Sequence, residues 1–169
     1  MRRLLPPALL LPLLLGLTGC GLHPMYAGGT AGPVATTLAR VEVAPIAGKA
    51  GWLVGNALRD RLSAMGGGEP LYRLDVTLDD QISGLGVNRS DAITRERRTL
   101  RARFQLVDLA KGTVLLDDSA GSDAGIDVVG SEYATIAAEN SALENLSDTV
   151  ADKIVQRLAL YAQRTKTAK

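Results

Sequence analysis

The chain begins with an apolar stretch, and its later hydrophobic positions then follow two different periods. After "MRR", the fourteen residues from Leu4 to Leu17 are apolar and include three prolines. A membrane-spanning helix needs roughly 18–20 such residues, and proline interrupts a regular helix. A short basic start followed by a stretch of this length is typical of a secretory signal peptide. We therefore predict that residues 1–19 are a cleaved signal.

The middle of the chain alternates between apolar and polar residues, as half-buried strands do. Alternation predicts strands in residues 38–46 and 71–82, then a hairpin that turns from Asp108 to Gly112. Residues 83–91 are rich in glycine and polar residues, which predicts a loop. The strand after the turn carries Val114 and Leu116 and is expected to fade in "DDSAGSDAGIDVVG".

Two other segments repeat their apolar residues every three or four positions, which predicts amphipathic helices. The first carries Trp52, Leu53, Leu58, Leu62 and Met65 and ends at the glycines 66–68. The second begins after Ser131, a residue suited to cap a helix amino terminus. Its apolar stripe consists of Leu143, Leu146, Val150, Ile154, Leu158 and Tyr161.

The order β-α-β-β-β-α predicts an α+β fold, a two-layer sandwich with two helices packed on one face of a four-stranded mixed sheet. The first two strands are expected to be parallel because a helix connects them. We predict one domain over residues 38–163, a polar tail at 164–169, and a flexible tether at 20–37, which is rich in Gly, Ala, Pro and Thr. Trp52 and Phe104 are expected in the core.

Composition excludes some classes of partner. The 19 basic and 18 acidic residues leave a net charge of +1, so an anionic partner would need a local basic patch. Aromatic residues make up only 4% of the chain, which gives no saccharide-stacking surface. An exported protein is not expected to bind nucleic acid.

Cys20 is the only cysteine and directly follows Leu17, Thr18 and Gly19. These four residues resemble the lipobox of bacterial lipoproteins. The resemblance implies that the Cys20 thiol carries a diacylglyceryl group, that cleavage precedes it, and that its amino group is acylated, for example with palmitate. The alternative is a free or intermolecularly paired thiol, since one cysteine cannot form an internal disulfide. Residue 21 is Gly instead of the Asp that retains such proteins in the inner membrane, which indicates the outer membrane.

No arrangement of residues indicates catalysis or a cofactor other than the lipid on Cys20. The single histidine, His23, lies in the tether without further metal ligands beside it. Asp79 and Asp80 are adjacent in a strand, so they point to opposite faces and cannot act as an acid–base pair. A calcium loop in residues 117–127 is a weaker alternative, because the spacing differs from that of an EF-hand. The chain is therefore predicted not to be an enzyme.

Two segments resemble the LptE lipoproteins of lipopolysaccharide assembly, in their alphaproteobacterial form. "CGLHPMY" follows the lipobox, where that family shows Cys-Gly-Phe, a short spacer, a hydrophobic residue and Tyr. "EYATIAAENSALENLSDTVADKIVQRLALY" is similar to its Ala- and Glu-rich helix near the carboxyl terminus. The order of elements agrees over residues 20–162. Leu22 replaces a frequent aromatic and "ENSALENL" is less basic than in many relatives, so no residue-level role is transferred from the helix.

The resemblance implies an outer-membrane lipoprotein on the periplasmic face, without catalysis. It would sit partly inside the large barrel LptD and help to deliver lipopolysaccharide to the outer leaflet. The main alternative is an auxiliary lipoprotein of another envelope lipid-transport system, which can have a similarly small α+β domain. A peptidoglycan-acting or peptidoglycan-binding lipoprotein has less support, because the chain lacks the catalytic and aromatic residues.

One local concentration of positive charge remains, in the predicted hairpin. It consists of Arg95, Arg97, Arg98, Arg101 and Arg103. Alternation places Arg97, Arg101 and Arg103 on one strand face. Guanidinium groups bind phosphate bidentately, so all five arginines are candidates for a basic face that contacts lipopolysaccharide phosphates or acidic groups of the barrel lumen. Alternatively, it is a solvated face whose arginines pair with Asp75 and Asp79 of the neighbouring strand.

Overall fold

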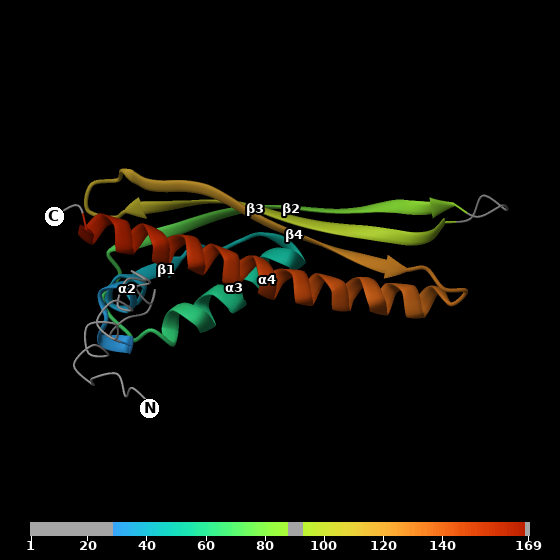
Figure 1. Cartoon of the computed structure of the whole chain (residues 1–169), viewed down its shortest axis with the longest axis horizontal. Coiled ribbons are helices and arrows are strands. Elements are labelled where there is room, and N and C mark those ends of the chain that lie inside the picture. The colour runs from blue at the N-terminus through green and yellow to red at the C-terminus, as the bar shows by residue number, and fades with distance from the viewer. Residues whose placement is uncertain (1–28, 88–92, 168–169) are drawn as a thin grey trace, which may run out of the picture.

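A four-stranded mixed sheet is covered on one face by helices in the computed structural model, which describes residues 29–87 and 93–167 (Figure 1). The elements are η3 (Gly29–Ala31), α2 (Pro33–Leu38), β1 (Val41–Val43), α3 (Gly48–Ser63), β2 (Tyr72–Val87), β3 (Ile93–Asp108), β4 (Val114–Asp127) and α4 (Glu132–Thr167). The strands follow one another across the sheet in the order β1-β2-β3-β4. β1 is parallel to β2, and the other pairs are antiparallel. The predicted α+β two-layer sandwich is confirmed.

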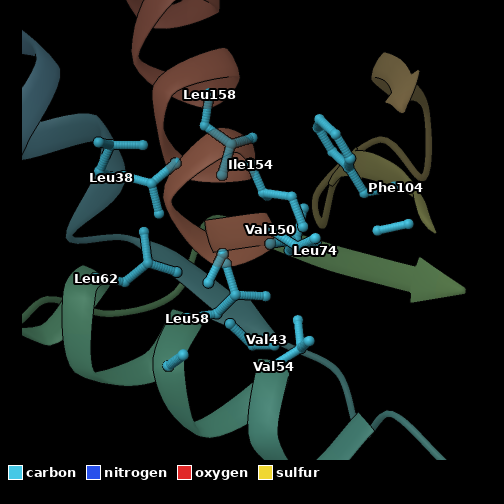
Figure 2. Packing of buried hydrophobic residues seen from close by; sticks show 14 of the residues in the cluster. Leu38, Val43, Val54, Leu58, Leu62, Leu74, Phe104, Val150, Ile154 and Leu158 are labelled. Carbon is cyan, nitrogen blue, oxygen red and sulfur yellow. The ribbon is translucent and has the colours of Figure 1, made fainter. Parts of the chain in front are cut away.

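The core lies between the sheet and the helices (Figure 2). Phe104 of β3 and Leu74 of β2 are fully buried and meet Leu58 of α3 and Ile154 of α4 in one cluster. The predicted stripe of α4 faces this cluster, with Tyr161 only partly buried. The predicted burial of Phe104 is therefore confirmed.

Two strands are longer than the alternation predicted. β2 continues through residues 83–87, which we expected in a loop, and residues 88–91 of that predicted loop lie outside the described residues. β4 does not fade after Leu116 but pairs with β3 as far as Asp127. The apolar side of this part of β4 is built mainly from alanine and serine, so its hydrophobic alternation is weak. Pairing with β3 stabilises a strand that its own residues specify poorly.

In the predicted stripe over residues 52–65, Leu58 and Leu62 are buried and Leu53 and Met65 pack against the core, so only Trp52 is misplaced. Trp52 is 64% exposed and is not a core residue, whereas Val54 and Leu58 are fully buried. The reason is the close approach of the helix to the chain before it: a Cβ atom at Gly51 would lie 2.6 Å from the carbonyl oxygen of Ile46. The small residue marks the buried side of α3, and Trp52, the next residue, therefore points away from it.

Part of the predicted tether is folded. α2 has Pro33 in its first turn, where proline is well tolerated, and buries Val34, Ala35 and Leu38. This helix packs against α4. Residues 33–37 therefore belong to the domain, which corrects the predicted boundary at residue 38. A helix of only six residues is too short to show a clear hydrophobic period.

The amino-terminal end of α4 is capped as predicted, because the amide of Ala134 donates to Ser131 Oγ at 3.4 Å. At its other end α4 continues to Thr167, so the first residues of the predicted polar tail are helical. None of the described helices combines the length and the apolar composition needed to cross a bilayer.

Candidate functional site

The face of the sheet that points away from the helices is strongly charged, and we call it the open face. The register of β2, β3 and β4 assigns residues to it, because directly paired residues of antiparallel strands share a face. On these three strands its basic residues are Arg73, Arg95, Arg97, Arg101 and Arg103, and its acidic residues are Asp75, Asp79, Asp117, Asp123 and Asp127. The formal charges of these two sets cancel, and Glu42 of β1, opposite Arg73 in the register, adds one negative charge.

Most of these arginines are paired with aspartates. Three ion pairs join β3 to β4, with nitrogen–oxygen distances of 2.8 Å for Arg103–Asp117, 3.1 Å for Arg95–Asp127 and 3.9 Å for Arg97–Asp123. A fourth lies within β2, between Arg73 and Asp75 at 2.8 Å. Exposed pairs of this kind contribute about 0–1 kcal/mol each, so they order the surface more than they stabilise the fold. The alternative of a paired face is thus supported, but the partners of the clustered arginines on this face lie on β4 and are not the expected Asp75 and Asp79.

Arg101 is different from its neighbours. It stands directly opposite Asp79 in the register, yet it forms no ion pair with any described residue. The carboxylate of Asp79 accepts hydrogen bonds from Gln81 instead. Arg101 lies over Gly121, where a Cβ atom would be 3.2 Å from Arg101 Cγ. The glycine leaves room for this exposed side chain, and Arg101 is the arginine of the predicted cluster whose charge is most available to a partner.

Arg98 does not belong to the open face. It lies on the helix side of the sheet, where it pairs with Asp80 at 2.6 Å and donates to the carbonyl of Glu139 at 2.8 Å. Its side chain is only 11% exposed. The hydrogen bond to Asp80 raises the pKa of Arg98. The prediction that groups Arg98 with a binding face is therefore wrong in its geometry: the residue ties β3 to α4.

The sequence did not assign the acidic residues of β4 to the open face, because the segment was not recognised as a strand. Asp117, Asp123 and Asp127 recur on the open face, whereas Asp118 points to the helix side and pairs with Arg157 of α4 at 3.3 Å. This division between two faces contradicts the calcium-loop alternative. Within residues 29–87 and 93–167, no three metal-ligating side chains are grouped to hold an ion. The sequence did contain one sign of this strand: glycine and aspartate alternate at every second position in Gly121, Asp123, Gly125 and Asp127.

The pKa of Asp117 offers a direct check of the pairing. Hydrogen bonds from Arg103 and then Gln105 lower this pKa from 3.8 to about 2. A lowered pKa means that the pairing contributes stability above pH 3.8, and that this contribution is lost as the pH falls towards 2. We expect an NMR titration of the Asp117 carboxyl to have its midpoint near 2 and Arg103→Gln to raise it. Arg95→Gln, at the other end of β3, should leave the midpoint unchanged. A midpoint near 3.8 in the unmodified chain would contradict the pairing.

The predicted lipid-attachment residues lie outside the described part of the chain. These are Leu17, Thr18, Gly19 and Cys20, and the same holds for His23. The lipidation of Cys20 therefore stays a prediction.

Comparison with known proteins gives the family. A family model described as "LptE: Lipopolysaccharide-assembly" matches residues 38–158, which is most of the chain. No curated protein matches by sequence. The match covers the sheet, α3 and most of α4, and so includes the whole open face.

Solved structures share the fold. A putative lipoprotein from Caulobacter crescentus CB15 is 25% identical, with a TM-score of 0.66 over 80% of this chain and 98% of that one. The rare lipoprotein B from Shewanella oneidensis is 12% identical, with a TM-score of 0.59 over 75% and 98% of the two chains. A minor lipoprotein from Acinetobacter baumannii is 14% identical, with a TM-score of 0.59 over 72% and 92%. Together with the family match over residues 38–158, these observations identify the chain as a member of the LptE family of lipopolysaccharide-assembly lipoproteins.

Proposed function

We propose that the chain is a non-enzymatic subunit of the lipopolysaccharide translocon of the outer membrane. It is anchored on the periplasmic face by the acyl chains of Cys20, sits partly inside the LptD barrel, and helps to deliver lipopolysaccharide to the outer leaflet. The observation that carries the proposal is the family match across the folded domain, residues 38–158. The lipobox that precedes the domain supplies the anchor.

The shape of the domain suits a plug. β2 and β3 have 16 residues each, and at ~3.3 Å per residue such a hairpin is about 50 Å long. α4 runs along it with 36 residues and a similar length, at ~1.5 Å per residue (Figure 1). The cross-strand ion pairs give this elongated body a polar outer wall with balanced charge. The interiors of large outer-membrane barrels are also polar, so such a wall is compatible with a lumen.

Within this function, we assign the open face to contact with acidic groups, either lipopolysaccharide phosphates or carboxylates of the barrel lumen. Arg101 needs no change of partner to make such a contact, because it forms no ion pair with a described residue. Arg97 is only loosely paired, at 3.9 Å, and is half exposed. Arg103 would have to exchange Asp117 for the new partner. We therefore expect the three arginines to contribute unequally, with Arg101 first.

The association can be tested by purifying the tagged, full-length lipoprotein from mildly solubilised outer membranes. A large β-barrel protein in a constant ratio is the expected partner. An inner-membrane transporter instead would favour another envelope lipid-transport system, and retention on murein sacculi would favour a peptidoglycan-binding protein. Either of these results without a barrel would overturn the proposal.

Reversing the charge of Arg97, Arg101 and Arg103 to glutamate should weaken association with the barrel or with lipopolysaccharide by about tenfold or more, because buried contacts between opposite charges become repulsive. The same change at Lys49, Lys111 and Arg164, which lie outside both the open face and the groove beside β1, is the matched control. Circular dichroism establishes that both variants fold. If both kinds of binding survive in a folded open-face variant, the assignment of the open face is wrong.

A further inference from the structure

The free edge of β1 borders a groove beside the end of α3. The groove has a volume of about 420 Å³ and runs between β1, the end of α3 and the glycines that follow it. Leu62 of α3 and the two valines of β1 supply its apolar wall, and Gly67 leaves its side open, with nothing within 4 Å of a Cβ atom placed there.

Only half of the backbone N–H and C=O groups of β1 form hydrogen bonds with β2. The carbonyl of Arg40 accepts from the amide of Tyr72, and the amide of Ala44 donates to the carbonyl of Leu74. In a strand, successive residues point their N–H and C=O groups to alternate sides. The even-numbered residues therefore bond to β2, and Val41 and Val43 present their N–H and C=O groups to the groove.

The opposite edge of the sheet is protected in a way that β1 is not. On β4, the amide of Ser119 is bonded to Asp118 Oδ1 at 2.7 Å, and the carbonyl of Gly121 accepts from Lys153 Nζ at 2.6 Å. Proteins commonly cover sheet edges in this manner because bare edges pair with other strands. No described side chain makes a hydrogen bond to the backbone of Val41 or Val43.

We propose that this groove binds a short extended segment of a partner protein, which adds to the sheet beside β1 as a fifth strand. Its backbone would bond to Val41 and Val43, and an apolar side chain would enter the groove against Leu62. Pro45 follows the strand and limits the site to a few residues.

Other occupants fit these observations less well. A lipid chain could fill the apolar part of the groove but has no amide or carbonyl row for the two valines. A second copy of β1 in the antiparallel register that pairs Val41 with Val43 would set Glu42 beside its own copy, and like charges directly opposite are destabilising. A backbone from a different protein satisfies the hydrogen bonds without this conflict.

The probe is a synthetic peptide of alternating leucine and threonine with lysine at both ends. It is added to the full-length, ¹⁵N-labelled mature lipoprotein in detergent micelles. We expect the amide signals of Val41 and Val43 to shift on addition. Two N-methylated peptides test whether the peptide backbone bonds to β1. If the added strand is antiparallel, methyl groups on the leucine amides should weaken binding about tenfold. If it is parallel, methyl groups on the threonine amides should have this effect. The other version should bind normally.

Filling the groove provides a second measure. Gly67→Phe should weaken peptide binding about tenfold, whereas Gly130→Phe, at an equally open position away from the groove, should not. Absence of shifts at Val41 and Val43 would overturn the proposal. So would equal binding of both methylated peptides, or self-association of the chain through β1. The assay contains neither lipopolysaccharide nor a barrel, so its result is independent of the proposed function.

Discussion

Replacing Phe104 with alanine should lower the free energy of unfolding by about 3–5 kcal/mol, the typical cost of removing a buried aromatic side chain. Phe104 of β3 is fully buried, and its loss leaves a cavity between the sheet and α4 that a rigid two-layer core cannot close. Thermal and denaturant unfolding of the full-length protein in detergent would measure the change.

Trp52→Ala is the matched control for this variant. The tryptophan side chain is larger than that of Phe104, but it is 64% exposed on α3. Its removal should cost about 0.5 kcal/mol or less, as for ordinary surface substitutions. Similar losses for the two variants would show that the packed face of α3 is not the one with Gly51 and Leu58.

Replacing Cys20 with serine should abolish membrane anchoring. A serine hydroxyl cannot form the thioether that the lipobox implies, and we expect processing to depend on the attached diacylglyceryl group. Each buried methylene contributes about 0.8 kcal/mol of membrane affinity, so losing two or three acyl chains removes nearly all of it. We expect a precursor that retains residues 1–19, incorporates no labelled palmitate, and is missing from the outer membrane.

His23→Ala is the control for Cys20→Ser, because it changes a nearby residue of the same segment without touching the thiol. It should be processed, acylated and sorted normally. The anchor would be refuted by mature wild-type protein with an unmodified sulfhydryl, or by Cys20→Ser protein that fractionates with the outer membrane like the wild type.

The sequence predicted those parts of the fold in which large apolar residues keep a regular period. β3 alternates Leu100, Phe104 and Leu106 with arginines, and α4 repeats leucine, valine and isoleucine over several turns. Such residues bury enough area to decide the structure locally. They predict the element order, the two layers and the buried side of β3.

The sequence did not predict the elements that depend on tertiary contact. The second half of β4 has small residues on its inner side, and α2 has only six residues, so neither carries a strong period. In α3, the periodicity predicted the buried Leu58 and Leu62 but not the exposure of Trp52, which accompanies the close approach of Gly51 to Ile46. These elements are stabilised by β3, α4 and the chain before α3, respectively.

The sequence showed the positive charge of the arginine cluster, but it did not show which arginines have ion-pair partners. Strand alternation placed Arg97, Arg101 and Arg103 together, whereas the partners of Arg97 and Arg103 on β4 followed only from the register. Arg98 was separable by the same alternation, and the structure shows it between Asp80 and α4. The candidate site therefore contains fewer arginines than the sequence cluster. Arg101 is its arginine without an ion-pair partner among the described residues.

The most direct test of the proposed function is to deplete the lipoprotein from growing cells and measure newly made lipopolysaccharide at the cell surface. We predict that surface delivery falls while lipopolysaccharide accumulates at inner sites, and that wild-type protein restores delivery whereas Cys20→Ser does not. Unchanged delivery after complete depletion would contradict the assignment of this chain to the translocon.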